Sequence, residues 1–353
     1  MTKTALVVGA TGIVGSALSA LLVKTGWTVL GLSRHPVSQQ GVTAVTADLH
    51  DPVALAATLA KTQPSHVFIC TWARQATEAE NIRVNSAMVR NLLDALRPAA
   101  TVRHVALVTG LKHYLGPFEA YGKGKSPQTP FRETQPRLDL ANFYYAQEDE
   151  VFAAAARDGF TWSVHRPHTI IGEAVGNAMN MGTTLATYAT ICREAGRPFR
   201  FPGSAAQWNS LTDMTDARLL AQHLLWAATT PAAADEAFNV VNGDVFRWNW
   251  MWGQLADWFG IEAEVFDGEV RPLEQQMAGD NDLWAEIAKR HDLVEPDLKR
   301  LASAWHTDAD LGRPVEVVTD MSKSRRLGFN LYQPTDDAFF DLFKKLRADR
   351  LIP

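Results

Sequence analysis

The sequence predicts an α/β fold in which a doubly wound, parallel sheet carries helices on both faces. The first observation is that short apolar runs alternate with amphipathic segments over the first 172 residues, a rhythm that produces parallel strands joined by crossover helices. The second is a glycine-rich turn at residues 9–15, between the first apolar run and the first helical segment. A strand, a glycine turn and a helix in this order are typical of a Rossmann-type sheet.

The expected elements follow in order along the chain. Each expected strand is a short apolar run, and each expected helix has apolar residues three and four positions apart. We expect strands at residues 5–8, 28–30, 42–45, 66–71, 104–109 and 161–165, and helices at residues 14–22, 52–60, 85–96 and 143–157.

The rhythm stops near residue 172, where helical stretches rich in Trp and Met begin to alternate with short strands. We therefore expect a Rossmann-type domain over residues 1–172 and a smaller, mostly helical region over residues 173–353. Residues 237–242 are a candidate strand that returns to the main sheet.

Composition narrows the class of protein. The 353 residues are 46% hydrophobic and 21% charged, which suits a chain with a large buried core. A formal net charge of -5 without a polybasic run gives no reason to expect nucleic acid or a membrane surface. The N-terminal apolar run is too short for a signal segment or a membrane span. With two cysteines, Cys70 and Cys192, the chain fits a reducing compartment, so we expect a cytoplasmic protein with a small-molecule partner.

The glycine turn is the first candidate binding site. Its glycines are Gly9, Gly12 and Gly15. Backbone N–H groups of such a turn and the N-terminus of the helix after it can bind a pyrophosphate. We therefore predict that Thr11, Ile13 and Val14 contact a dinucleotide. The alternative is a glycine turn with a purely structural role, and its position after the first strand favours binding.

The end of the second strand indicates which dinucleotide is bound. An NAD site usually has an acidic residue there, which binds the ribose 2′-hydroxyl. This chain has Ser33 and Arg34 instead. A hydroxyl and a guanidinium suit a 2′-phosphate, so we predict NADP(H). The alternative is that Arg34 is a solvated surface arginine.

Further candidates follow the later strands, because ligands bind at the carboxyl edge of such sheets. Asp48 and Leu49 follow the third strand, where Asp48 can accept a hydrogen bond from adenine or cap the helix that begins near Pro52. The fourth strand ends at Thr71, Trp72 and Ala73, and the fifth at Thr109 and Gly110. We predict that all of these residues contact the cofactor, with a place in the core as the alternative for Trp72.

The usual catalytic motif of short-chain dehydrogenases is missing. That motif is Tyr-x-x-x-Lys on one helix, and here the residues four positions after Tyr144 and Tyr145 are Glu148 and Asp149. A lysine, Lys112, stands instead directly after the fifth strand. We interpret Tyr145 as a packing residue, because adjacent helical positions point about 100° apart.

Four segments carry a resemblance to a known family. They are Thr-Gly-Leu-Lys-His-Tyr-Leu-Gly-Pro-Phe at 109–118, Asn-Phe-Tyr-Tyr-x-x-Glu-Asp at 142–149, Thr-Trp-Ser-Val-His-Arg-Pro at 161–167, and Ala-Phe-Asn-Val-Val-Asn-Gly-Asp-Val-Phe at 237–246. The chain resembles the progesterone 5β-reductase and iridoid synthase family of atypical short-chain dehydrogenases. The similarity extends from Gly9 to Pro353.

The resemblance implies NADPH-dependent 1,4-reduction of an activated C=C bond in an enone or enal, with hydride added to the β-carbon. It implies that Lys112 and Tyr144 are the catalytic residues. The chemistry agrees, because hydride addition leaves negative charge on the carbonyl oxygen and a preorganised phenol can donate a hydrogen bond to that enolate. Lys112 would set the electrostatics of the tyrosine or hold the nicotinamide ribose.

The resemblance also implies contacts around the nicotinamide and the substrate. The backbone at Pro167, Thr169 and Ile170 would contact the carboxamide, and the family has Gly and Asn where this chain has His168 and Thr169. An aromatic cavity rich in Met suits a flat, hydrophobic substrate. The expected substrate contacts are Trp72, Phe118, Tyr144, Met181, Trp208 and Tyr332, the last in place of a phenylalanine of the plant proteins; the alternative for each aromatic is a core position.

Other interpretations stay open. One alternative to enone reduction is an NADP-dependent carbonyl reductase or nucleotide-sugar epimerase, and the missing Tyr-x-x-x-Lys motif argues against it. Another is a non-catalytic NADP(H)-binding sensor. No metal is expected, because His113, His165 and His168 lack a metal-ligand spacing, and we interpret them as hydrogen-bonded structural histidines. The apolar C-terminal region could cover either a core or a homodimer interface.

Overall fold

The computed structural model describes residues 3–117, 120 and 128–353, and its centre is a seven-stranded parallel sheet with the strand order β3-β2-β1-β4-β5-β6-β9. The order runs outward in both directions from β1, which is the doubly wound arrangement. The strands are β1 (Thr4–Val8), β2 (Thr28–Ser33), β3 (Val42–Thr46), β4 (His66–Ile69), β5 (His104–Val108), β6 (Thr161–Pro167) and β9 (Glu236–Val240). The predicted fold class is confirmed.

Helices cover both faces of this sheet, as the strand sequences require. Successive side chains of β1 point to opposite faces: Leu6 and Val8 pack with α2 (Pro52–Leu59), α3 (Glu78–Leu96) and α5 (Phe143–Asp158). Ala5 and Val7 pack with α1 (Ile13–Lys24) and α8 (Ala217–Thr229). Apolar residues on both faces explain why each strand is a continuous apolar run rather than an alternating one.

The largest boundary error of the prediction concerns α3. The helix was expected over residues 85–96 and spans Glu78–Leu96. Thr77 accepts a hydrogen bond from the backbone N–H of Glu80 at 3.2 Å, and Glu78 and Glu80 lie in the positive first turn. An N-cap residue followed by acidic residues favours helix initiation. The helix therefore begins in polar turns that precede the apolar pattern.

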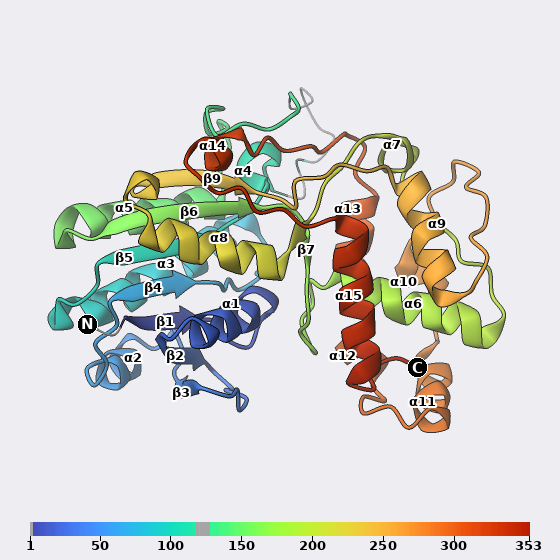
Figure 1. Cartoon of the computed structure of the whole chain (residues 1–353), viewed down its shortest axis with the longest axis horizontal. Helices are drawn as coiled ribbons and strands as arrows, with labels where there is room; N and C mark the ends of the chain where they lie inside the picture. The colour runs from blue at the N-terminus through green and yellow to red at the C-terminus, as the bar shows by residue number, and fades with distance from the viewer. Residues whose placement is uncertain (1–2, 118–119, 121–127) are drawn as a thin grey trace.

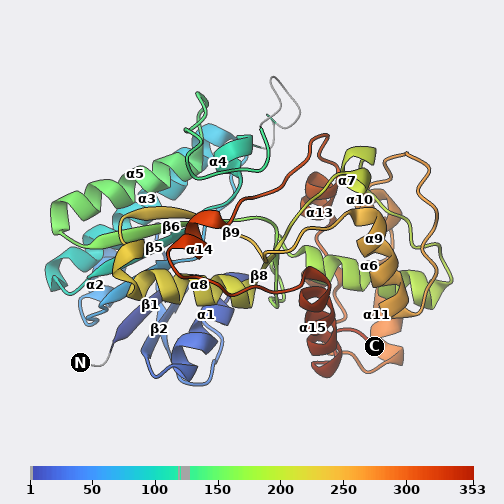
Figure 2. The same cartoon turned by 45° about the horizontal axis from the view of Figure 1, so that its top comes forward.

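The second half of the chain contributes to both halves of the molecule (Figure 1). β9 pairs in parallel with β6, so residues 236–240 do return to the main sheet. Helix α8 lies on that sheet, and both views place α14 (Ser322–Arg326) beside β9 (Figure 2). A short parallel pair, β7 (Ile170–Ile171) with β8 (Thr215–Asp216), lies between the sheet and the helical half.

A separate core holds the helical half together. It contains Trp248, Trp252 and Trp284, each at most 1% exposed, and the Trp252 and Phe199 rings stack at 4.1 Å. Among the described residues no helix has the length and apolar character needed to cross a membrane. The remaining helices are α4 (Lys112–Leu115), α6 (Met181–Ala195), α7 (Ala205–Asn209), α9 (Trp248–Phe259), α10 (Leu273–Gln276), α11 (Asn281–Arg290), α12 (Leu298–Leu301), α13 (Ala304–Leu311) and α15 (Thr335–Ala348), with 3-10 turns at Arg97–Ala99 and Pro231–Ala233.

Candidate active site

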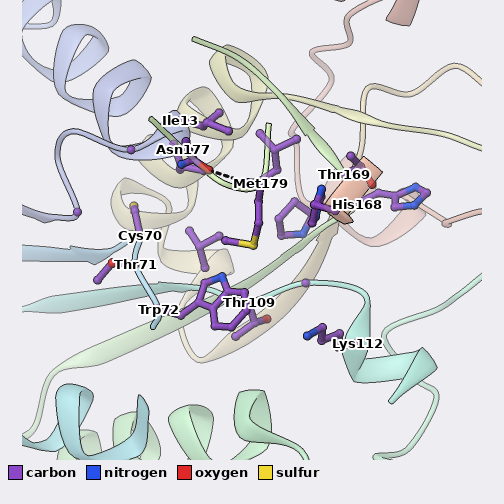
Figure 3. Close-up of a pocket in the computed structure, with 18 of the residues that line it drawn as sticks. Ile13, Cys70, Thr71, Trp72, Thr109, Lys112, His168, Thr169, Asn177 and Met179 are labelled. Carbon is purple, nitrogen blue, oxygen red and sulfur yellow. Dashed lines mark hydrogen bonds between the residues drawn. The ribbon is translucent and has the colours of Figure 1, made fainter. Parts of the chain in front are cut away.

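A cleft of about 450 Å³ lies at the carboxyl edge of the sheet, between the strand ends and helix α13. The turn after β1, the ends of β4, β5 and β6, and residues 175–179 line it. Figure 3 shows Trp72, Thr109 and Lys112 on one side of this cleft, and His168 with Thr169 on another. The cleft occupies the place where open α/β sheets bind ligands.

The glycine turn after β1 is built for close backbone approach. Gly9 has φ +83°, and a Cβ on Gly15 would lie 2.1 Å from the Gly9 carbonyl oxygen, so only glycine fits at Gly15. Helix α1 begins after Gly12, whose lack of a side chain leaves the first N–H groups without a side-chain cap, and its first turn has no acidic residue. Gly12, Ile13 and Val14 line the cleft. The Gly12 N–H donates to the Gly9 carbonyl at 3.0 Å, so the N–H groups of Ile13 and Val14, with the helix dipole, make the cradle that fits a pyrophosphate.

The end of β2 contributes a cation and an unpaired hydroxyl. Arg34 lines the cleft and is exposed to solvent. The Ser33 Oγ is buried and has no hydrogen-bond partner among the described residues. A buried hydroxyl without a partner is unusual. Ser33 is not among the residues that line the cleft, so Arg34 is the residue at the end of β2 that fits a ligand oxygen there.

Asp48 and Leu49 do not line the cleft. Asp48 is exposed, and its Oδ1 accepts a hydrogen bond from the His50 backbone N–H at 3.0 Å and contacts His50 Nδ1 at 2.7 Å. These hydrogen bonds lower the pKa of the Asp48 carboxyl. Leu49 is buried in the core beside the sheet. Asp48 is also not the helix cap, because Asp51 accepts the hydrogen bond from Ala54 N at 3.0 Å.

The ends of β4 and β5 carry most of the cofactor contacts that the sequence predicted. Thr71, Trp72, Thr109 and Gly110 line the cleft. Ala73 does not line it, because its backbone N–H and C=O are both bonded to the Asn85 side chain, at 2.7 and 2.9 Å. The hydrogen bonds of Asn85 hold the chain after β4 in place.

Lys112 and Tyr144 both line the cleft although they come from different elements. Lys112 begins α4 and is 8% exposed, with its Nζ 5.2 Å from the centroid of the Trp72 ring. Tyr144 lies in the first turn of α5 and is also 8% exposed. A Cβ on Gly110 would lie 3.3 Å from the Tyr144 hydroxyl, so the missing side chain of Gly110 leaves room for the phenol.

Asn142 connects the two elements. Its Oδ1 accepts a hydrogen bond from the Tyr144 backbone N–H at 3.0 Å, which caps helix α5. Its Nδ2 donates to the Lys112 backbone carbonyl at 2.8 Å. A single buried amide therefore fixes the start of α5 relative to the start of α4.

The helical position that usually carries the catalytic lysine holds a buried ion pair here. Glu148 accepts hydrogen bonds from Arg137 at 2.8 Å and from Arg166 at 3.3 Å. Burial alone would raise the pKa of Glu148, but His113, Arg166 and Arg137 around it lower that pKa. Tyr145 donates to the His113 carbonyl at 2.5 Å and accepts from Leu138 N. Glu148 therefore neutralises neighbouring arginines, and Tyr145 packs against the backbone of other segments.

Comparison with known proteins adds a family to this geometry. Residues 5–241 match the model of the NAD dependent epimerase/dehydratase family. The chain is 38% identical to an (S)-8-oxocitronellyl enol synthase of Camptotheca acuminata, over 99% of this chain and 93% of that protein. It is also 38% identical to a 3-oxo-Delta(4,5)-steroid 5-beta-reductase of Arabidopsis thaliana, with the same coverage.

The chain belongs to the progesterone 5β-reductase and iridoid synthase family. It is therefore an oxidoreductase with a nicotinamide cofactor. Among solved structures, a putative epimerase from Burkholderia cenocepacia is similar in fold, with a TM-score of 0.69, 20% identity and 98% of each chain covered. In this chain Lys112 and Tyr144 lie on separate elements, and Glu148 stands where Tyr-x-x-x-Lys would have its lysine.

The structure does not bring every predicted substrate contact into the cleft. Met181 is fully buried in the helical core, and Met179 lines the cleft in its place. Trp208 packs on Phe201 and on Phe266, with ring centroids 4.9 and 5.0 Å apart. Tyr332 is 70% exposed and lies outside the cleft. Trp72 does line it, and Phe118 lies outside the described residues.

The side of the cleft formed by residues 167–170 contains further residues that sequence reasoning missed. Pro167, Thr169 and Ile170 line it as predicted, but so do His306, Asp310 and Arg313 from α13 and the chain after it. The sequence offered one signal, the spacing of His306 and Asp310 one helical turn apart, which is too common to identify a site. Within the described part of the chain, no group of three or more His, Cys, Asp or Glu residues is arranged to hold a metal.

The three predicted structural histidines differ in their surroundings. His165 is fully buried and hydrogen bonded to Ser163 and to His223. His113 is buried with its Nδ1 3.7 Å from Glu148 Oε1, beyond hydrogen-bond distance. His168 lines the cleft and is hydrogen bonded on both ring nitrogens.

Proposed function

We propose that the protein catalyses NADPH-dependent 1,4-reduction of the activated C=C bond of an enone or enal. The observation that carries the proposal is the convergence of Lys112 and Tyr144 on one cleft from separate elements, with Glu148 paired to arginines where the usual lysine would stand. The names of the relatives support it, since one is a steroid 5-beta-reductase and others are enol synthases. An enol product is what addition of hydride to the β-carbon of an enal generates.

The cleft residues fit NADPH at three points. The N–H groups of Ile13 and Val14 at the start of α1 would hold the pyrophosphate. Arg34, which follows the buried Ser33, would hold the 2′-phosphate. The chain from Pro167 to Ile170 would hold the nicotinamide carboxamide. When bound, NADPH supplies the hydride.

The chain's own residues stabilise the charge that hydride addition creates. Negative charge develops on the carbonyl oxygen of the substrate, and the Tyr144 phenol donates a hydrogen bond to that oxygen. Lys112 places a cation within the same buried environment, where electrostatic interactions are stronger than in water. Because the oxygen carries charge without needing a proton in the same step, Tyr144 acts as a hydrogen-bond donor rather than an obligatory acid. Trp72 and Phe143 stack at 4.9 Å beside Lys112 and limit its freedom.

A direct assay tests this proposal. NADPH absorbance is followed with a panel of small enones and enals for the wild type, Tyr144→Phe and Lys112→Met. Tyr144→Phe should lower kcat by about 10²-fold, the usual effect of losing one oxyanion donor. Tyr145→Phe is the matched control, because that hydroxyl bonds to the backbone outside the cleft, and its kcat should stay near the wild-type value.

Three other outcomes would contradict the proposal. A wild type that binds NADPH but consumes none with any activated alkene would be a sensor. Oxidation of an alcohol by NADP⁺, without alkene reduction, would make the protein a carbonyl reductase assayed in the reverse direction. Equal kcat values for Tyr144→Phe and Tyr145→Phe would remove Tyr144 from the mechanism.

A further inference from the structure

A second group of polar and charged residues lies in the cleft, separate from Lys112 and Tyr144. We call His168, Thr169, His306, Asp310 and Arg313 the polar cluster. All five line the cleft, and His168, Asp310 and Arg313 are 7%, 6% and 4% exposed. Charged side chains are rarely buried this deeply without a specific role or partner.

The hydrogen bonds fix the protonation of His168. Its Nδ1 lies 2.9 Å from Asp213 Oδ1, and its Nε2 lies 2.7 Å from Arg313 Nη1. A guanidinium can only donate, so Nε2 must accept and the ring proton must be on Nδ1. Asp213 is held in turn by the Thr319 backbone N–H at 2.6 Å. His168 is therefore a neutral acceptor that positions Arg313.

Asp310 holds the other side of the guanidinium. It forms an ion pair with Arg313 Nη2 and accepts a hydrogen bond from the Thr169 hydroxyl. Burial alone would raise the pKa of Asp310, but the neighbouring Arg313 and His306 keep that pKa below its usual range. Asp310 is thus an anion, and it is the one carboxylate among the described residues that line the cleft.

The polar cluster is not internally complete. Arg313 Nε and His306 Nδ1 are buried and have no hydrogen-bond partner among the described residues. Arg313 Nε is always a donor, and His306 Nδ1 donates in the tautomer that carries the proton there; a buried polar atom without a partner is unfavourable. A ligand oxygen that pairs with either atom would remove this unfavourable state.

Cations outnumber anions around this end of the cleft. Lys112 and Arg313 line it, and Arg74 stacks on the ring of Trp305, the residue before His306, at 3.7 Å. Asp310 is already paired to Arg313. The surplus positive charge favours an anionic group on the bound molecule.

We propose that Arg313 and His306 recognise a carboxylate on the substrate. This inference rests on the proposed enone reduction and adds the substrate class to it. The substrate is then an enone or enal that carries a carboxylate, in contrast to the wholly hydrophobic molecule that the sequence suggested. His168 and Asp310 are positioning residues, because they act through Arg313.

A matched pair of substrates tests the assignment. One is a cyclic enone with a carboxyethyl side chain, and the other is its methyl ester, which keeps the carbon skeleton and removes the charge. The wild type should prefer the acid by about tenfold or more in kcat/KM, the effect of one charge-assisted hydrogen bond. His306→Phe should reduce this preference toward unity, His306→Gln should retain part of it, and the Kd for NADPH should stay unchanged in both.

Arg313 is tested together with its partner, so that no buried charge is left alone. The double variant Arg313→Met with Asp310→Asn should also lose the preference for the acid, and it should bind the saturated acid product no more tightly than its ester. His291→Phe is the control, because His291 lies on the surface with Glu194 and away from the cleft, and it should keep the wild-type preference.

The outcomes separate this inference from the proposed function. If the wild type reduces the ester as well as the acid, enone reduction stands and the carboxylate site is refuted. A rise in the Kd for NADPH with an unchanged acid preference in His306→Phe would assign the polar cluster to the cofactor and refute it too. If neither enone consumes NADPH, the proposed function fails, while tighter binding of the saturated acid than of its ester would still support the carboxylate site.

Discussion

Buried histidines on the sheet and on helix α8 should make this protein lose stability as the pH falls from 7 to 5. His104 Nε2 and His165 Nε2 both lie 2.9 Å from Ser163 Oγ, and His165 Nδ1 lies 3.0 Å from His223 Nδ1. His223 Nε2 lies 2.9 Å from Ser324 Oγ, which ends this chain of hydrogen bonds. A protonated imidazole can only donate, so this chain needs neutral histidines as acceptors.

Burial lowers the pKa values of these histidines in the folded protein. The pKa of His104 falls to about 3 and that of His223 to about 3. Burial, with a smaller effect of Lys3, lowers the pKa of His66 to about 4. In the unfolded chain each of the three returns to about 6.5. Below pH 6.5 the unfolded state therefore binds more protons, so stability is present at neutral pH and is lost as the pH falls toward 4.

The size of the effect follows from proton linkage. At pH 5 the unfolded chain carries about three more protons on these residues than the folded chain does, which gives a slope of about 4 kcal/mol per pH unit. Integrated from pH 7 to pH 5, each histidine contributes about 2 kcal/mol. The sum of about 6 kcal/mol is comparable with the whole stability of an ordinary domain.

Urea unfolding followed by tryptophan fluorescence measures this slope. His104→Gln is the informative variant, because an amide can still bond to Ser163 but does not titrate. Its slope near pH 5 should be lower than that of the wild type by about 1.4 kcal/mol per pH unit, whatever its stability at pH 7. His35→Gln, at an exposed loop position, is the control and should match the wild-type slope. Equal slopes for His104→Gln and the wild type, at equal m-values, would refute the reasoning.

Three further predictions concern the active site. Arg34→Asp should weaken NADPH binding by about 10- to 100-fold but leave NADH binding unchanged, as fluorescence titration would show; equal affinities in the wild type would contradict it. Asn142→Ala should lower kcat by about tenfold, and Asn142→Asp should restore the helix cap but not kcat, since a carboxylate cannot donate to the Lys112 carbonyl. Gly15→Ala should abolish NADPH binding, because its Cβ would lie 2.1 Å from the Gly9 oxygen, whereas Gly253→Ala, with open space around it, should not.

The predicted site residues that line the cleft are mostly those whose position local rules determine. A glycine turn between a strand and a helix has few alternative geometries, and Gly9, Gly12 and the start of α1 do line the cleft. Lys112 begins α4 shortly after β5 ends at Val108, so the position of the sheet edge constrains its place. Tyr144 follows from its position in the first turn of a capped helix.

The parts that sequence reasoning missed depend on contacts between distant segments. Arg313 reaches His168 across 145 positions of the chain, and nothing in the local pattern near α13 indicates that contact. Met181 and Trp208 were predicted to contact the substrate but do not line the cleft, for a different reason. An apolar side chain has the same sequence signature in a core as in a cavity, and only the packing of the helical half shows that Met181 belongs to the core.

The separation of Lys112 from Tyr144 also explains why this site cannot return to the usual motif by one substitution. A lysine at position 148 would stand on the same helix as Tyr144, but that position faces Arg166 and Arg137, which Glu148 now neutralises. Glu148→Lys would place a buried cation beside the buried Arg166 and the partly exposed Arg137 in place of the carboxylate that neutralises them, and removing one partner of a buried pair already costs about 3–5 kcal/mol. Arg166 lies on β6 next to Pro167, so the strain would reach the strand end that lines the cleft. The ion pair of Glu148 on α5 therefore disfavours a lysine at that position, and the lysine that lines the cleft comes from α4 instead.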